Sequence, residues 1–483
     1  MKITITNFGP IQRFHYDLSK DIVVTFGDNN IGKSYAMQTV YLLLKTFVET
    51  PGGSFSYGYS YDLVQYSYFP RLRVASSYYE NLKETISSFS KGKETQIEIT
   101  DQINTVAVQA IADMLISGFV NSCENTFGNF KGIIAQKPTI HVEFDNFCMT
   151  ISLGESTPMK ANFYSVPTYI KRATSDFHKS RNSKGKLDIY YFKDANIPLE
   201  VIAEQVDRAI STILNTLHTY VGNVYFLPAS RSGIYSGMSA FSSIVAELSK
   251  NRAMLTRKIE LPGISEPISD YFLMLSNIRN KENSAFSDVY QRIEDNILHG
   301  KVRFNKSRNT LVYTPNNLGH EFEMTEVSSM VSEISPIVAF LKYIVASPSK
   351  RSRNQKQKPI VFIEEPEAHL HPKNQLKLIE LFAELHKYNI KVVISSHSNY
   401  IFNKLNNLLL KGDLTPSIYS AILLTQEASG SISTFMPMDE LGVDDTNFMD
   451  VTQALYNERE ELIAAWNDDA AWNDDADWNN EPT

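Results

Sequence analysis

The feature that most constrains this chain is a glycine-rich stretch at residues 23–34, which reads V-V-T-F-G-D-N-N-I-G-K-S. The apolar, β-branched run 22–26 before it predicts a strand, and the apolar segment 35–48 after it predicts a helix. The spacing G-x-x-x-x-G-K-S is typical of a P-loop, whose backbone N–H groups wrap a phosphate chain at the N-terminus of a helix. The sequence therefore predicts an α/β fold that binds a nucleotide at this loop.

The loop also predicts individual contacts to ATP and Mg²⁺. We expect Lys33 to reach the β- and γ-phosphates, and the hydroxyl of Ser34 to bind Mg²⁺. A glycine turn beside an unrelated strand is the alternative, which the order strand, loop, helix disfavours. The predicted nucleotide contacts of the chain's own loop are Gly27, Asn29, Asn30, Gly32, Lys33, Ser34 and Tyr35.

A second motif, P-I-V-F-I-E-E at residues 359–365, supplies the carboxylates that hydrolysis would need. Its apolar run indicates a strand buried on both faces of a parallel sheet, and we expect it to neighbour the P-loop strand. Glu364 and Glu365 follow at its C-terminal end, where ligands of open α/β sheets bind. We predict that Glu364 holds the magnesium through water and that Glu365 orients and deprotonates the attacking water. An exposed acidic strand end is the alternative.

A third predicted strand, residues 390–394, is followed by S-S-H-S. We expect this strand to lie two strands from the P-loop and its histidine, His397, to act as a donor that senses the γ-phosphate. A buried structural histidine is the alternative. The pair His369 and His371 has no third ligand at a suitable spacing, so we assign no metal to it.

Together, F-G-D-N-N-I-G-K-S, V-F-I-E-E-P-E-A-H-L-H-P and S-S-H-S resemble the RecF/SMC-type branch of the ABC ATPases, and P-E-A-H-L-H-P resembles the OLD-like ATPases of bacterial anti-phage systems. The resemblance covers about residues 1–50 and 325–440. It implies an ABC-type P-loop ATPase head with a mixed or parallel core sheet and a large α+β insertion. No heptad pattern persists, so we predict no long coiled coil.

In the family that the chain resembles, two heads sandwich ATP, and each P-loop faces a signature serine–glycine motif of the other head. Residues 327–333 occupy the corresponding place, so Ser329 or Ser328 would contact the γ-phosphate of the other head. Met330 stands where the family usually has glycine, which implies slow or trigger-dependent hydrolysis. Arg231, in P-A-S-R-S-G, resembles the family's polar loop and is a weaker candidate near the nucleotide.

The resemblance implies an ATPase without an effector domain of its own. Too few residues follow Ser398 for a Toprim nuclease domain, and there is no HNH-like cysteine–histidine pattern. We therefore expect a sensor and scaffold subunit that controls a separate nuclease or toxin, similar to the ATPase subunits of the Septu and PARIS systems. The expected partners are a second copy in a head-to-head dimer or higher homo-oligomer, an effector protein and a phage protein that acts as trigger.

Two other functions stay open at this point. The basic loop at residues 350–358 is compatible with a RecF-like DNA repair ATPase that binds DNA. Met330 is compatible with a nucleotide-binding interaction module that hydrolyses little ATP.

Along the chain we predict five parts. They are an N-terminal half of the ATPase head at 1–50, an α+β insertion at 51–220, a helical and strand segment joining the head at 221–325, a C-terminal half at 326–456 and an acidic tail with a tryptophan repeat at 457–483. The insertion begins with a tyrosine-rich stretch and contains a basic run, residues 171–186.

Charge and hydropathy restrict the partners further. Residues 457–483 hold nine acidic residues and one arginine, which accounts for the whole net charge of −8. The rest of the chain is balanced, so its total charge argues neither for nor against nucleic acid. No apolar run approaches the roughly 20 residues that span a bilayer, so we predict no membrane partner and a cytoplasmic location. Cys123 and Cys148 match no metal or redox spacing.

Overall fold

The structure is a computed structural model. It describes residues 1–50, 80–172, 180–183, 185–191, 199–237, 263–279, 281–346, 357–439, 442–443 and 453–465. The tyrosine-rich stretch, residues 173–179 and 184 of the basic run, most of the basic loop 350–358 and the tryptophan repeats lie outside these residues.

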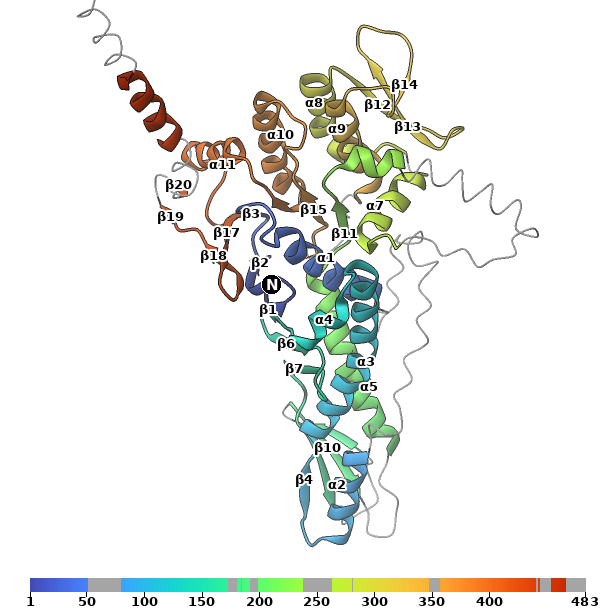
Figure 1. The fold of residues 1–483 in the computed structure, drawn as a ribbon. Helices are drawn as coiled ribbons and strands as arrows, with labels where there is room; N and C mark the ends of the chain where they lie inside the picture. The colour runs from blue at the N-terminus through green and yellow to red at the C-terminus, as the bar shows by residue number, and fades with distance from the viewer. Residues whose placement is uncertain are drawn as a thin grey trace, which may run out of the picture.

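One sheet of 11 strands organises the molecule (Figure 1). Its strands are β1 (Lys2–Phe8), β2 (Ile11–Asp17), β3 (Ile22–Phe26), β5 (Thr139–Phe144), β6 (Phe147–Ser152), β7 (Met159–Phe163), β11 (Val224–Leu227), β15 (Ile360–Glu364), β16 (Lys391–Ser395), β17 (Tyr419–Glu427) and β18 (Gly430–Phe435). They lie in the order β11-β15-β16-β3-β17-β18-β2-β1-β5-β6-β7. The first five of these strands are parallel to one another, and β1, β2, β5, β6 and β7 pair antiparallel. The prediction of an α/β fold with a mixed core sheet is confirmed.

Helices cover both faces of this sheet. They are α1 (Lys33–Glu49), α3 (Thr100–Thr126), α4 (Phe130–Ala135), α5 (Leu199–Tyr220), α7 (Glu266–Ser276), α8 (Ser287–Ile293), α9 (Ser329–Ala339), α10 (Pro372–Glu384) and α11 (Asn399–Lys411). All five residues of β3 are buried: Val23 faces the core around α1, while Ile22, Val24 and Phe26 face the core around α9, α10 and α11. This alternation is what a strand between two helical layers requires.

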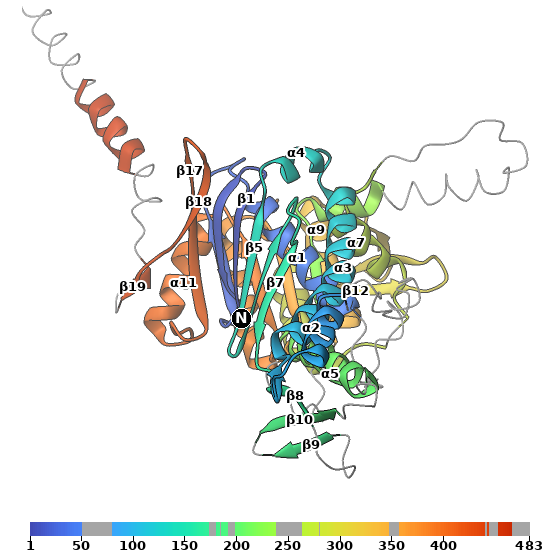
Figure 2. The same cartoon turned by 90° about the horizontal axis from the view of Figure 1, so that it is seen from below.

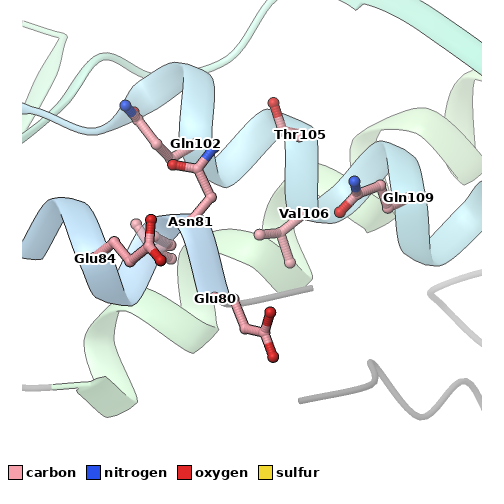
Figure 3. A pocket seen from close by; sticks show the side chains of 8 residues that line it. Glu80, Asn81, Glu84, Gln102, Thr105, Val106 and Gln109 are labelled. Carbon is pink, nitrogen blue, oxygen red and sulfur yellow. The ribbon is translucent and has the colours of Figure 1, made fainter. Parts of the chain in front are cut away.

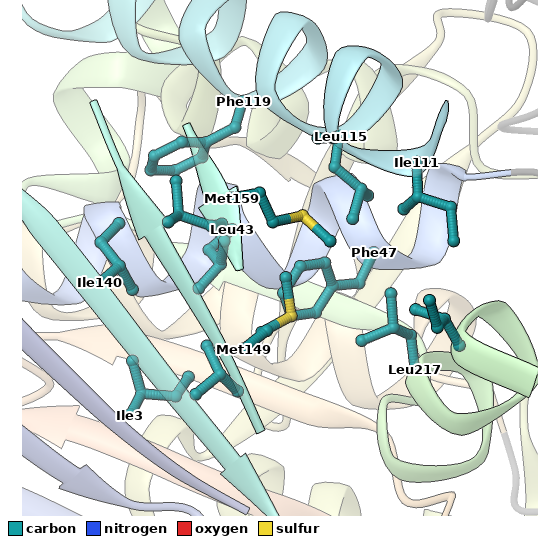
Figure 4. Close-up of a cluster of buried hydrophobic side chains, with 14 of the residues drawn as sticks. Ile3, Leu43, Phe47, Ile111, Leu115, Phe119, Ile140, Met149, Met159 and Leu217 are labelled. Atoms are coloured by element: carbon teal, nitrogen blue, oxygen red, sulfur yellow. The ribbon is translucent and has the colours of Figure 1, made fainter. Parts of the chain in front are cut away.

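Part of the predicted insertion belongs to the same core as the P-loop helix. Strands β5, β6 and β7 extend the sheet beyond β1, and α3 packs over them beside α1 (Figures 1 and 4). Leu43 and Phe47 of α1 lie among residues of α3 and of these strands. The other labelled members of this cluster are Ile3, Ile111, Leu115, Phe119, Ile140, Met149, Met159 and Leu217. The segment 51–220 therefore contributes to the head itself, although its predicted domain boundaries stay a prediction.

Smaller sheets lie outside this core. A four-stranded sheet of β4 (Gln96–Glu98), β8 (Thr168–Arg172), β9 (Ser180–Ser183) and β10 (Lys186–Tyr191) lies with α2 (Glu80–Lys91) at the far end of α3 and α5 (Figures 1 and 2). Strands β12 (Gly300–Asn305), β13 (Thr310–Pro315) and β14 (Phe322–Glu323) precede α9, and β19 (Met438–Asp439) pairs with β20 (Gly442–Val443). The described residues contain no long coiled-coil arm.

Helix α3 has the length and composition of a membrane-spanning helix, which the sequence analysis did not anticipate. It is the one helix of this kind in the part of the chain that the structure describes. Its residues Ile103, Ile111, Leu115 and Phe119 are buried in the core shared with α1 and α5.

Candidate nucleotide-binding site

The P-loop joins β3 to α1 and needs glycine at two positions for different reasons. Gly27 has φ 143°, and a side chain there would collide with the carbonyl oxygen of Leu424 on the neighbouring strand β17. Gly32 has φ 97° and occupies the N-cap of α1, where a Cβ would lie 2.9 Å from Ile11. Because residues with a side chain rarely adopt these backbone conformations, both positions of the motif require glycine.

The remaining loop residues divide into exposed and packed side chains. Asn29 and Asn30 are exposed, and Asn30 has φ 64°. The ring of Tyr35 instead stacks on Phe127 with centroids 4.8 Å apart. Since the first N–H groups of a helix have no carbonyl partner within it, the backbone of Lys33, Ser34 and Tyr35 is the place where a phosphate would bind.

The amine of Lys33 lies at the centre of the loop. Its Nζ donates to the carbonyl oxygens of Gly27 at 2.8 Å and of Asp28 at 2.5 Å, and lies 3.2 Å from Nδ1 of His397. Burial lowers the pKa of Lys33 to about 8, while the carboxylates of Glu365, Asp28 and Glu367 act in the opposite direction.

Glu364 ends β15 as a buried carboxylate beside the start of α1. It accepts from the backbone N–H of Ala229 at 3.3 Å and from Nε2 of Gln38 at 3.4 Å, and the hydroxyl of Ser34 also hydrogen-bonds to it. Burial raises the pKa of Glu364, these hydrogen bonds lower it, and the neighbouring Glu365 raises it further.

The hydroxyl of Ser34 and the carboxylate of Glu364 fit a magnesium ion. In nucleotide sites Mg²⁺ is held by few protein oxygens, such as one hydroxyl and one carboxylate. Water and phosphate oxygens fill most of its coordination positions. A bound cation would also offset part of the cost of burying the carboxylate of Glu364.

Glu365 and His397 form a direct contact at the end of the sheet. Glu365 has φ 41°, an uncommon conformation for a residue with a side chain, and its N–H donates to the carbonyl oxygen of Ser395 at 3.0 Å. Its Oε1 lies 3.2 Å from Nε2 of His397, and this hydrogen bond lowers the pKa of Glu365 against the effect of burial. Because an ammonium group can only donate, Nδ1 of His397 accepts from Lys33 and Nε2 donates to Glu365.

The order of the strands corrects one prediction. Strand β16, which precedes His397, lies directly between β3 and β15. The histidine therefore follows the neighbour of the P-loop strand, and the two glutamates follow the strand after that, the reverse of our expectation. A continuous apolar run shows that a strand is buried but not which strand it pairs with. This order places His397 between Lys33 and Glu365.

Glu367 and Gln38 also support the site, although neither was among the predicted site residues. Oε1 of Glu367 accepts from the hydroxyl of Ser396 and from the N–H of His397, each at 2.7 Å, and so holds the loop of the histidine. Gln38 stands four residues after Ser34, on the same face of α1. That spacing is the signal that could have predicted its approach to Glu364.

A family model described as AAA ATPase domain matches residues 1–402. The chain belongs to this AAA ATPase domain family. No curated protein matches the chain.

Solved structures similar to this AAA ATPase domain protein include Smc heads. A structure of the SmcHead bound to the C-winged helix domain of ScpA is 11% identical, covers 91% of this chain and 98% of its own, and has a TM-score of 0.35. The Smc head domain with an extended coiled coil from Pyrococcus furiosus is 11% identical, with 95% and 98% covered and a TM-score of 0.33. The SMC head domain from Thermotoga maritima is 9% identical, with 90% and 98% covered and a TM-score of 0.33. These TM-scores add nothing to the family assignment.

The signature-like segment, residues 327–333, makes no hydrogen bond to the P-loop of the same chain among the described residues. Ser329 is exposed at the first position of α9, and Ser328 caps the helix by accepting from the N–H of Val331 at 3.5 Å. The sulfur of Met330 accepts from the side-chain amide of Asn374 at 3.2 Å. Among the described residues, no hydrogen bond joins Ser329 to the loop, so its contact with another head stays a prediction.

Two other candidates have positions of their own. Arg231 is completely buried behind the two glutamates rather than exposed at the loop. His371 caps α10 by accepting from the N–H of Lys373 at 3.3 Å.

A separate hollow of about 440 Å³ lies between α2 and α3 (Figure 3). Its walls include Glu80, Asn81, Gln102 and Gln109, and none of its lining residues belongs to the predicted nucleotide site. The candidate nucleotide site is therefore built from the P-loop and the strand ends, and this pocket lies outside it.

Proposed function

We propose that this protein hydrolyses ATP and is the sensor and scaffold subunit of an anti-phage defence system, where it controls a separate nuclease or toxin. The observation that carries the enzymatic part is the row of contacts Lys33–His397–Glu365 beside the Ser34–Glu364 pair. A phosphate-binding amine and a carboxylate that can orient water are recurring parts of sites that transfer a γ-phosphate, and here His397 joins the two.

The proposed reaction assigns one role to each side chain. The loop backbone and Lys33 bind the phosphates, while Ser34 and Glu364 would hold Mg²⁺, which when bound neutralises phosphate charge. Glu365 takes the proton of a water whose oxygen attacks the γ-phosphorus. The bond from that phosphorus to the bridging oxygen breaks, and ADP and inorganic phosphate leave. His397 keeps Glu365 ionised and oriented through its Nε2–H.

The scaffold part of the proposal is supported by the helix at residues 453–465. Every residue of this helix is exposed, including the apolar side chains Leu455, Tyr456, Leu462 and Ile463. Leu455 and Leu462 are seven residues apart, as are Tyr456 and Ile463, and this spacing places all four on one side of the helix. We propose that the effector binds this apolar side, that two heads pair around ATP with Ser329 at the other copy's γ-phosphate, and that the protein works in the cytoplasm.

The first test compares ATP turnover and ATP binding in wild type and Glu365→Gln. We expect kcat to fall by at least about 100-fold while the Kd for ATP changes little, because the general base is lost and the phosphate contacts remain. Glu427→Gln, a substitution of an exposed glutamate at the end of β17, is the matched control and should keep full turnover. Tight ATP binding with no turnover, unaffected by Glu365→Gln, would favour the interaction module with little hydrolysis.

The scaffold part is tested by purifying the protein after expression with the neighbouring genes. We expect wild type to retain a nuclease-like or toxin-like protein, and a chain ending before Gln453 to lose it. Retention of duplex DNA with ATP, sensitive to salt and without a protein partner, would instead establish the DNA repair function.

A further inference from the structure

Arg231 is a fully buried arginine at the start of the helix at residues 231–237. Its guanidinium donates to four backbone carbonyls: Nη1 to Pro228 at 3.0 Å and to Glu364 at 2.8 Å, Nη2 to Glu365 at 3.3 Å, and Nε to Glu333 at 3.1 Å. One side chain therefore holds the backbone of both glutamates at the end of β15.

A buried carboxylate on α9 holds this arginine in turn. Oε2 of Glu333 accepts the N–H of Arg231 at 3.0 Å and lies 3.4 Å from its Nε. Oε1 of Glu333 accepts the N–H of Ser232 at 3.2 Å and its hydroxyl at 2.7 Å. Glu333 stands four residues after Ser329, so both lie on the same side of α9, one turn apart.

The conformation of Glu365 explains why such support is needed. Its φ of 41° is one that a residue with a side chain keeps only where its surroundings impose it. Three hydrogen bonds do so here: the N–H of Glu365 donates to Ser395, and its carbonyl accepts from Arg231 and from the N–H of Ala368 at 3.1 Å. Of these, only the bond from Arg231 comes from a side chain, and without it the peptide that carries the carboxylate is held less firmly.

We propose that Arg231 is a positioning residue for Glu365, and that with Glu333 it ties the backbone of Glu365 to the N-terminal turn of α9. The inference rests on the proposed function, in which Glu365 activates the attacking water. Arg231 donates to no predicted nucleotide contact of the loop, and its bond to Glu364 reaches the backbone carbonyl rather than the carboxylate that would hold magnesium. We therefore expect its effect in turnover rather than in ATP binding.

The test is Arg231→Lys, which keeps the charge but loses the fork that reaches several carbonyls at once. We expect kcat to fall by about 10- to 100-fold, since a small misplacement of a catalytic group is costly, while the Kd for ATP stays within about twofold. Unchanged kcat would overturn the proposal, and so would a Kd that weakens in step with kcat, because Arg231 would then act in binding.

A matched control exists at the far end of the molecule. The guanidinium of Arg172 also donates to several backbone carbonyls, those of Phe89, Ser90, Gly92 and Glu94. Arg172→Lys should leave kcat unchanged. An equal loss of kcat in both variants would mean that any loss of such an arginine weakens the whole fold, which overturns the specific role.

Amide hydrogen exchange provides a readout that does not depend on turnover. We expect Arg231→Lys to speed exchange in the segment 360–368 and Arg172→Lys to speed it only near residues 89–94. If wild type does not hydrolyse ATP, the proposed function fails, and exchange in segment 360–368 then decides the role of Arg231 alone: faster exchange supports it, and unchanged exchange overturns it.

The tie to α9 is tested by combining Arg231→Lys with Glu333→Gln. If the two residues act as a unit, the double variant loses much less activity than the product of the two single losses. Independent losses would overturn the connection to α9.

Discussion

Gly27 illustrates how much of this site depends on single backbone positions. The residue directly follows the P-loop strand, and a Cβ there would collide with the carbonyl oxygen of Leu424, which belongs to the neighbouring strand β17. Its carbonyl also accepts a hydrogen bond from the amine of Lys33. A shift of this one residue would therefore displace both the loop and the amine that is expected to bind phosphate.

At the residue scale we predict that Gly27→Ala weakens ATP binding by at least about tenfold. The new methyl group meets a backbone oxygen that cannot move aside, and the left-handed conformation adds a cost of about 1–3 kcal/mol to folding. Calorimetric titration with ATP and thermal unfolding would measure the two effects. Gly128→Ala is the control, because no atom lies within 4 Å of the position a Cβ would take. Wild-type ATP affinity in Gly27→Ala would contradict the required close approach.

The element that carries the P-loop, helix α1, is attached to α7 by a cluster of charges. Nζ of Lys45 lies 2.5 Å from Asp270, 2.8 Å from Glu266 and 3.8 Å from Glu49. The hydroxyl of Tyr41 donates to Asp270 at 2.7 Å. Burial opposes the charge of Lys45, but the three carboxylates hold its pKa above the usual value. This cluster fixes the helix behind the phosphate loop.

At the element scale we predict that Lys45→Met destabilises the protein by about 3–5 kcal/mol, because three carboxylates are left without their cation. Thermal or urea unfolding would measure the loss. Lys411→Met, which removes an exposed ion pair with Asp413 at 2.7 Å, should leave the Tm nearly unchanged. Equal Tm values for the two variants would show that the cluster contributes nothing.

Glu49→Gln in the same cluster should have the opposite effect. Burial raises the pKa of Glu49 even though Lys45 acts against it, so the folded protein holds this proton at a higher pH than the unfolded chain does. Such a group costs stability above its folded-state pKa and costs nothing at a pH below its usual value. Glu49→Gln should therefore raise the Tm at pH 7, and the gain should shrink as the pH falls towards 4.

Across the whole molecule, the nucleotide site and the signature-like segment come from parts of the chain that are far apart in sequence. The site lies at the ends of β3, β15 and β16, while Ser329 is exposed on α9. Within the described residues the hydrogen bonds of Arg231 and Glu333 link α9 to the end of β15. A second head that binds Ser329 would therefore meet a surface connected to the first head's glutamates.

At this scale we predict that Glu365→Gln forms a dimer with ATP, because bound nucleotide is no longer consumed. Size-exclusion chromatography with light scattering would measure the mass with and without ATP. Adding Ser329→Arg should abolish the dimer by placing a bulky side chain at the contact, whereas Ser88→Arg, on the exposed side of α2, should not. A dimer that persists in the Ser329→Arg variant would exclude this surface as the contact.

Local chemistry allowed the sequence alone to predict many elements and the types of residue at the site. The P-loop strand and helix, the strand that leads to Glu364 and the strand before His397 all lie where predicted, to within one or two residues. Short apolar runs, helical periodicity and the glycines of a phosphate loop are properties of neighbouring residues, so they can be read without knowing the fold.

Only the tertiary structure decided which strands are neighbours and which buried charges meet. The order of β16 and β15, the addition of β5 to β7 to the head's sheet, and the contacts of Arg231 with Glu333 and Glu364 join residues that are tens to hundreds of positions apart. A buried apolar strand has the same pattern beside any partner, and the sequence does not show whether an arginine is exposed or paired. The order of the strands and the contacts between buried charges depend on how the helices pack against the sheet, and this packing is a property of the whole chain.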